Sequence, residues 1–346
     1  MNQKEPATLP TFFSRILGFL RSHPILCLFF LTPGIIEYVS GSSPIANLVL
    51  SPPAFIIGLL INAALYLPGA LLIREAALRW KKGWASVLLL GAAYGVLEEG
   101  IALSTLFNKT NPPIPNPGYW HGVNWVYAAF VVPYHAVFSI ALPLLLLQLA
   151  LPSTKGRSLL NSKRAVAGTF AVLGTDVYLN LLITAHVEHF WMGLTVLIAS
   201  IVIIAALVVL AYKAPTNFMR PKNENPTAKP LVVGAFGALA YLLLALILVF
   251  GNNLPSSVDL FLTIIILLSF LVYILKAIGK GNNEKQLIAL SFGIILPFLA
   301  GGIAGQIELP LVLILDVALI LFFRRLWQKY SKGSMGHNNE IKTEET

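Results

Sequence analysis

The chain contains a single cysteine, Cys27, and few charged residues. One cysteine cannot form an intrachain disulfide, and a metal site built from cysteines needs more than one. Only 11% of the 346 residues are charged, whereas 57% are hydrophobic and the mean hydropathy is +0.78. This composition excludes an ordinary soluble domain and is typical of a multi-pass membrane protein.

The sequence also lacks a secretory signal, because the apolar region 12–31 has no small-residue cleavage site and many more apolar segments follow it. About ten apolar segments are long enough, or nearly so, to cross about 30 Å of hydrocarbon. The sequence therefore predicts an all-α, polytopic transmembrane helical bundle in the cell membrane. The expected spans cover residues 24–41, 54–74, 84–106, 124–150, 165–186, 190–212, 230–250, 257–276, 286–303 and 309–325.

Polar segments divide the chain into five parts. We expect a cytoplasmic N-terminus with an interfacial amphipathic helix (1–23) and a half that carries the polar site (24–212). A cytoplasmic linker (213–229), an apolar half (230–325) and a disordered cytoplasmic tail (326–346) should follow.

Lysine and arginine are absent from the interiors of the expected spans. In a ten-span topology every basic residue except Lys109 falls on one side of the membrane, so the positive-inside rule places both termini in the cytoplasm. These loops account for the net charge of +9. The expected partner is therefore the lipid bilayer, and the basic composition does not require nucleic acid.

Acidic residues, in contrast, do occur inside the spans. Burying one costs about 2.5–3.5 kcal/mol on insertion scales, which makes each a candidate functional residue. With no buried Lys or Arg beside them, such acids must stay protonated, pair with imidazolium or bind a cation. A purely structural hydrogen bond is the alternative for any one of them, and it is the better interpretation for the isolated Asp316. The five residues are Glu37, Glu98, Glu99, Asp176 and Asp316.

Histidines are expected at the same depth in the membrane as these acidic residues. His135 lies in the fourth expected span, while His186 and His189 lie at the outer end of the fifth. Gly91, Gly95 and Glu98 share one helix face, so a neighbouring helix can approach Glu98 closely. We predict a site formed by Glu98, Glu99, His135, Asp176 and Asn180. Candidate ligands of a divalent metal such as zinc are Glu99, His135, Asp176, His186 and His189.

A Glu-Glu pair in one span, a histidine in the next and a polar i, i+4 pair in the following one resemble the CPBP group, the CAAX-protease and bacteriocin-processing intramembrane proteases. The matching residues are Glu98-Glu99, His135 and Asp176-Val-Tyr-Leu-Asn180. The sequence has Leu103, Val131 and Asp176 where the family motifs have Arg, Phe and His. The resemblance implies that Glu98 and His135 activate water for attack on a peptide carbonyl, with the third motif at the oxyanion or a metal.

Three functions remain open from the sequence. The first is a protease-like hydrolase in the membrane, acting on a membrane-embedded or lipidated peptide. The second is a proton- or cation-coupled secondary transporter, in which the same acids bind the ion. The third is a non-catalytic membrane protein related to such proteases. An enzyme needs Glu98, His135 and Asp176 to converge, whereas a carrier needs a pathway that touches both halves of the chain.

Overall fold

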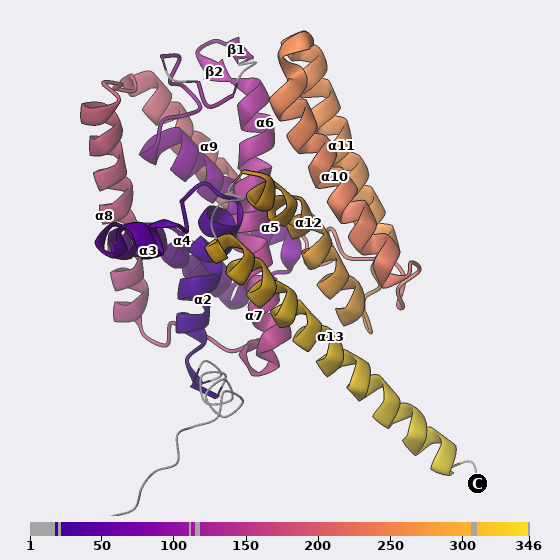
Figure 1. Cartoon of the computed structure of the whole chain (residues 1–346). Helices are drawn as coiled ribbons and strands as arrows, with labels where there is room; N and C mark the ends of the chain where they lie inside the picture. The colour runs from indigo at the N-terminus through magenta and orange to yellow at the C-terminus, as the bar shows by residue number, and fades with distance from the viewer. Residues whose placement is uncertain (1–17, 20–21, 111, 115–117, 306–309, 345–346) are drawn as a thin grey trace, which may run out of the picture.

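The computed structural model describes residues 18–19, 22–110, 112–114, 118–305 and 310–344 (Figure 1). The described part is a helical bundle with one short hairpin. Its α-helices are α2 (Pro24–Pro33), α3 (Asn47–Leu50), α4 (Pro52–Arg79), α5 (Trp84–Val96), α6 (Trp125–Tyr134), α7 (Leu142–Ala150), α8 (Lys163–Val187), α9 (Leu194–Lys213), α10 (Pro230–Phe250), α11 (Ser256–Ala277), α12 (Glu284–Gly305) and α13 (Pro310–Glu344). The π-helical segments are η1 (Gly34–Val39), η2 (Leu97–Ala102) and η3 (His135–Ala141), and the 3₁₀ segments are η4 (Pro152–Thr154) and η5 (Gly251–Asn253).

Within the described residues, eight helical stretches are long and apolar enough to cross a membrane. They correspond to eight of the expected spans, which confirms a polytopic helical membrane protein. The first expected span, 24–41, is a shorter apolar helix over Pro24–Val39, and the last, 309–325, falls on α13 outside this group of eight. The eight stretches are Pro52–Arg79, Trp84–Ala102, Trp125–Ala150, Lys163–Val187, Leu194–Lys213, Pro230–Phe250, Ser256–Ala277 and Glu284–Gly301.

The sequence also predicts the structure of the two chain ends, an amphipathic helix at the N-terminus and a disordered tail at the C-terminus. Most of the amphipathic helix expected near the N-terminus lies outside the described residues. The disordered tail expected over 326–346 stays a prediction, and α13 extends through most of this range, to Glu344. At the start of the range, the Tyr330 hydroxyl donates to the Leu149 carbonyl at 3.1 Å, and Lys329 Nζ donates to the same carbonyl at 3.0 Å. These contacts hold this part of α13 against the end of α7.

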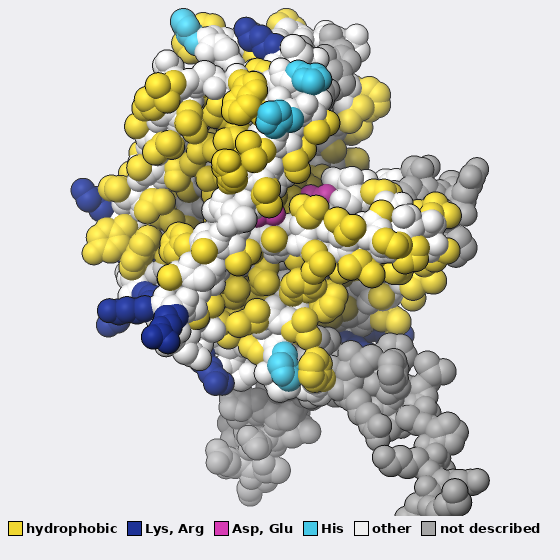
Figure 2. All heavy atoms as spheres, turned by 90° about the vertical axis from the view of Figure 1, so that its left-hand side faces the viewer, with side chains coloured by type: hydrophobic (Ala, Val, Ile, Leu, Met, Phe, Trp, Pro, Cys, Tyr) yellow, Lys and Arg dark blue, Asp and Glu magenta, His cyan; other side chains and the backbone are white. Residues whose placement is uncertain are grey.

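Burial separates a central helix from peripheral ones. α5 runs through the middle of the bundle and is mostly buried, whereas α8, α9 and α11 expose apolar side chains along most of their length (Figure 1). Figure 2 shows the resulting yellow surface on the side formed by α8. On that face Lys and Arg gather mainly toward the lower end, while most histidines lie at the upper end. An apolar outer surface of this kind suits contact with lipid rather than water.

The two halves expected from the sequence share one core. Phe138 in η3, Tyr241 in α10 and Phe298 in α12 pack together, with ring centroids 4.6–5.2 Å apart. Aromatic pairs at this spacing contribute about 0.5–1.5 kcal/mol beyond their buried area. The cluster therefore ties the second half directly to the segment that begins at His135.

The hairpin closes the upper end of the bundle. Strands β1 (Tyr119–Trp120) and β2 (Val123–Asn124) pair antiparallel through a two-residue turn at His121 and Gly122. Both turn residues have positive φ, 49° and 81°, as a type I′ turn requires. Asn124 then caps α6 by accepting a hydrogen bond from the Tyr127 amide at 3.1 Å. The loop thus fixes where α6 begins, and with it the depth of His135.

Glycines let α5 and the α6–η3 helix touch through their backbones. A Cβ added at Gly91 would lie 2.8 Å from the Cα of Ala136, and one at Gly95 would lie 3.2 Å from the His135 Cβ. At Gly91 a Cβ would require a shift of the neighbouring backbone, and at Gly95 it would make a tight contact. The close approach expected from the Gly91, Gly95 and Glu98 face is therefore confirmed.

Replacing Gly91 tests this contact. Gly91→Val should destabilise the protein by about 1–3 kcal/mol, because the added side chain overpacks a backbone-to-backbone contact. Circular dichroism during thermal or detergent-induced unfolding would measure the loss. Gly168→Val is the matched control, since a Cβ at Gly168 in α8 meets open space. Equal stability of the two variants would contradict the close packing.

The predicted orientation can be tested by cysteine labelling. In a Cys27→Ser background, Lys109→Cys should react with a membrane-impermeant maleimide in intact cells, because its loop is expected outside. Lys222→Cys, in the linker between α9 and α10, should react only after the cells are opened. Both lysines are exposed in the structure, so the reverse labelling pattern would invert the topology.

Candidate functional site

Three π-helical segments carry ionisable residues of the membrane interior. Glu37 lies in η1, Glu98 and Glu99 lie in η2, and His135 is the first residue of η3. A π-helical turn contains one extra residue, is rare in proteins and occurs frequently at functional sites. No other π-helical segment occurs among the residues described, and η1 is in contact with η3. The three widened turns therefore mark one place in the bundle.

His135 lies between two carboxylates. Its Nε2 is 2.8 Å from Glu99 Oε1, and its Nδ1 is 3.0 Å from Glu98 Oε2. The side chains are buried, with residue exposures of 1% for Glu98, 5% for Glu99 and 3% for His135. Neighbouring residues of a regular helix point about 100° apart, so two adjacent glutamates rarely share a partner. Here one imidazole reaches both because its two nitrogens face opposite ways.

Glu99 is fully held in place. The hydroxyl of Tyr127 donates to its Oε2 at 3.1 Å, and the hydroxyl of Thr105 donates to the same oxygen. On the other side of the imidazole, His135 Nδ1 is 2.8 Å from the Ser139 hydroxyl. These contacts fix the orientation of the ring and of one carboxylate.

Glu98 is held at one oxygen only. Its Oε1 accepts a hydrogen bond from the Tyr66 hydroxyl at 2.8 Å. Its Oε2 has no hydrogen-bond partner among the described residues, although His135 Nδ1 lies 3.0 Å away, because that nitrogen is directed at Ser139. A buried carboxylate oxygen without a partner is costly. This atom is therefore the position at which a proton, a water or a cation would be bound most favourably.

Tyr66 connects the cluster to a third acid, Glu37. Its hydroxyl lies 2.5 Å from Glu37 Oε1 as well as 2.8 Å from Glu98 Oε1. A tyrosine has one hydroxyl proton, so it can donate to only one of these carboxylates at a time, and the second contact requires a proton on the other. Glu37 is partly exposed, and its Oε2 accepts from Ser43 at 2.8 Å. In Figure 2 acidic side chains are visible at mid-height of the α8 face, set back between apolar residues.

Asp176 and Asn180 face the cluster from α8. Asn180 Nδ2 donates to Asp176 Oδ2 at 2.9 Å, so the two side chains are hydrogen-bonded to each other within α8. Asp176 is buried and lies within electrostatic range of Glu98, but it does not belong to the group of donor atoms around His135. Of the predicted site residues, Glu98, Glu99 and His135 therefore form one cluster, and Asp176 and Asn180 form a separate hydrogen-bonded pair within electrostatic range of it.

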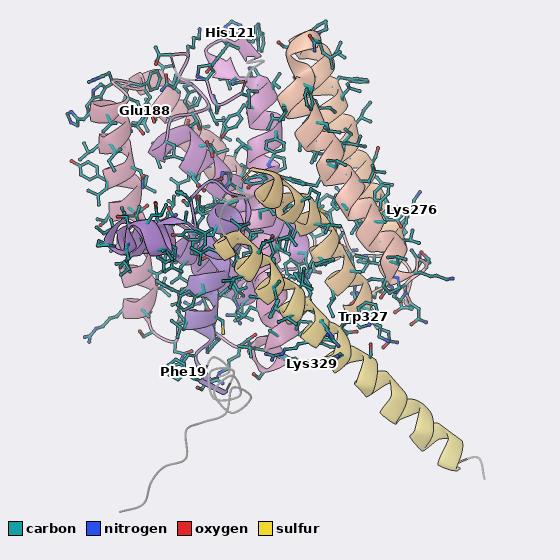
Figure 3. The ribbon with its side chains drawn as sticks, in the orientation of Figure 1. Phe19, His121, Glu188, Lys276, Trp327 and Lys329 are labelled. Atoms are coloured by element: carbon teal, nitrogen blue, oxygen red, sulfur yellow. The ribbon has the colours of Figure 1, made fainter. Side chains whose placement is uncertain are left out.

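The other predicted ligands lie elsewhere. His186 and His189 are exposed at the end of α8, where the His186 ring packs edge-on against Trp191 with centroids 5.9 Å apart. Glu188, between them, accepts a hydrogen bond from Asn108 at 2.9 Å and lies near the upper end of α8 (Figure 3). The structure therefore does not assemble the predicted metal set of Glu99, His135, Asp176, His186 and His189. His186 lies in the last turn of α8 and His189 just beyond it, and both are exposed.

The cluster itself offers a different donor set. One atom from each of Glu98, Glu99 and His135 lies within 4.8 Å of the others. Two carboxylate oxygens and one imidazole nitrogen suit zinc, and catalytic zinc sites use three protein ligands with a fourth position for water. The unpartnered Glu98 Oε2 fits this arrangement. The residues present are therefore compatible with a divalent ion, with Glu98 in place of Asp176.

Sequence reasoning missed the residues that connect the site. Glu37 was recognised as a buried acid but not placed in the site, and Tyr66, Thr105 and Tyr127 were not identified. A tyrosine in the apolar stretch 54–74 was the available signal for Tyr66. The π-helical turns, which set the directions of Glu37 and Glu98, leave no pattern in the sequence.

A family model described as an uncharacterized membrane protein family matches residues 26–325, a range that includes the Glu98–His135–Glu99 cluster, Glu37 and Asp176. No curated protein and no solved structure matches the chain. The matched range covers most of the 346 residues. This multi-pass protein with a buried Glu/His cluster therefore belongs to that uncharacterized family of membrane proteins.

Proposed function

We propose that this protein is a membrane-embedded hydrolase whose reaction centre is the Glu98–His135–Glu99 cluster. The observation that carries the proposal is the placement of one imidazole between two carboxylates, at 2.8 and 3.0 Å, in the membrane interior. Paired carboxylate and imidazole groups within hydrogen-bond reach are the usual means of general acid–base catalysis. A structural role alone would not require an unpartnered carboxylate oxygen at Glu98.

The two glutamates have different tasks in this proposal. Glu98 Oε2 accepts a proton from a water molecule, because it is a buried carboxylate oxygen that accepts no hydrogen bond from the described residues, with His135 Nδ1 3.0 Å away. Glu99 holds His135 in one orientation, since its own position is fixed by Tyr127 and Thr105. His135 stabilises the charge on Glu98 and passes a proton to the leaving group. A bound zinc ion would supply a more acidic water and a Lewis acid at the same three residues.

A route for protons supports the same site. Glu98, Tyr66 and Glu37 form a hydrogen-bonded chain that runs from the buried cluster to a partly exposed carboxylate. A proton released at Glu98 can leave along this chain without crossing hydrocarbon as a charge. Transfer of the proton from Glu98 to His135, 3.0 Å away, returns the base and the acid to their starting states after each turnover, and the chain lets this pair exchange protons with Glu37.

The substrate class follows from the position of the site. The cluster lies among apolar helices, so the substrate must itself be membrane-embedded or carry a lipid. The resemblance to CPBP intramembrane proteases, carried by Glu98-Glu99, His135 and the Asp176–Asn180 pair, favours a peptide bond as the target. Asp176 and Asn180 lie on the α8 side of the cluster, where that resemblance places the third motif.

The hydrogen-bonded chain also favours one alternative, a proton- or cation-coupled carrier. In a carrier the same acids would bind the ion, and Glu37 would be its point of exchange. The polar network nevertheless lies in the first half of the chain, whereas carriers built from inverted repeats place ion sites between two related halves. The hydrolase is therefore the better proposal.

The reaction can be tested with the full-length protein in liposomes that contain fluorogenic transmembrane and lipidated peptides. Cleavage should fall by about 10²–10⁴-fold in Glu98→Gln and His135→Ala, the usual loss when an acid–base group is removed. Asp316→Asn is the matched control, because Asp316 is a buried acid that lies outside the cluster. If no peptide is cleaved and Glu98→Gln instead abolishes a proton flux, the carrier is correct.

Metal content tests the ligand assignment separately. Wild-type protein purified in mild detergent should contain about one divalent ion per chain by mass spectrometry, and Glu98→Gln and His135→Ala should lose it, because each removes one of three donors. His186→Ala should retain the ion, since that side chain is exposed on the surface. Metal-free wild-type protein with intact cleavage would show that Glu98 and His135 act without an ion.

A further inference from the structure

A second site lies between the two halves of the bundle, away from the Glu/His cluster. It is a groove of about 720 Å³, within the range of ligand pockets. α5, η3 and α7 line one side, α11 and α12 line the other, and residues 216–221 with α13 border its mouth. None of the three clustered residues Glu98, Glu99 and His135 lines it.

The interior of the groove is apolar and long. Its floor includes Val137, Leu145, Phe270 and Ile294, which come from four different elements. From Val137 to Leu149 the lined face of η3 and α7 extends roughly 18 Å at 1.5 Å per residue. The groove thus reaches from the end of α7 well into the apolar region, and its depth suits a hydrocarbon chain.

The mouth of the groove is basic. Lysine or arginine side chains from four separate segments border it, and all four are exposed. Glu284 is the one acid among the lining residues, and Lys280 is paired with Glu224 at 2.5 Å. Lys155 and Arg220 form no ion pair within the part of the chain that the structure describes. Figure 3 places Lys329 at the lower end of the bundle, opposite His121. The four basic residues are Lys155, Arg220, Lys280 and Lys329.

We propose that this groove binds an anionic phospholipid, with the acyl chains on the apolar floor and the phosphate headgroup between Lys155 and Arg220. Basic pockets between membrane helices on the cytoplasmic side bind acidic headgroups in this way. A small water-soluble anion would leave the apolar floor uncovered. A zwitterionic lipid would gain little from a mouth with four cations and one acid. The charge at the mouth and the apolar depth together select an acidic lipid.

Lipid binding to purified full-length protein tests the proposal. We expect native mass spectrometry in a neutral detergent to show tighter binding of phosphatidylglycerol than of phosphatidylcholine. Lys155→Gln/Arg220→Gln should weaken phosphatidylglycerol binding about thirtyfold, because each cation near a membrane surface contributes a factor of about five to six. Lys163→Gln/Arg164→Gln is the matched control, since these residues are exposed at the start of α8 and do not line the groove.

Wild-type affinity for phosphatidylglycerol in the double variant would overturn the proposal, and so would equal binding of the two lipids by the wild type. Glycerol phosphate is added as a competitor: displacement of the lipid at equal concentration would show a phosphate site without a lipid role. If the double variant fails to fold, Leu145→Trp fills the floor with the cations intact, and it should also lose lipid binding. Lipid binding unchanged in Leu145→Trp would refute the assignment.

Discussion

Carboxylates in the interior of a membrane must find partners, and this requirement organises the centre of the bundle. Glu99 and one oxygen of Glu98 are satisfied by one imidazole, two tyrosine hydroxyls and a threonine, contributed by α4, the 103–108 segment, α6 and η3. Each partner comes from a different part of the chain, so the helices must converge to supply them. The glycines of α5 make this possible, because backbone contact at Gly91 and Gly95 brings His135 beside the acids. The close helix packing and the hydrogen bonding of the buried carboxylates therefore depend on each other.

Several parts of this structure follow from the sequence alone. Hydropathy predicts the membrane helices, since spanning hydrocarbon requires long apolar stretches whatever their neighbours are. The spacing of Gly91, Gly95 and Glu98 predicts the face of α5 that meets its neighbour, because it depends only on helical geometry. Histidine at the depth of the acids likewise points to His135.

Other parts depend on tertiary contacts that a sequence does not display. A π-helical turn adds one residue and rotates everything beyond it, so a regular helix does not predict that Tyr66 lies between Glu37 and Glu98. The ends of helices are also set by their neighbours. His186 shares α8 with Asp176 and His189 follows the end of that helix, but both lie at the surface, and α13 packs at Lys329 and Tyr330 against carbonyls of α7.

The segment η3 contributes residues both to the Glu98–His135–Glu99 cluster and to the basic groove. η3 begins with His135 on the side of the carboxylates, while Val137 and Ala141 of the same segment form part of the wall of the basic groove. η3 is a π-helical turn, which contains one extra residue. An occupant of the groove would contact the same segment that positions the imidazole. Under the two proposals, the composition of the surrounding membrane would therefore affect how firmly the Glu98–His135–Glu99 cluster is assembled.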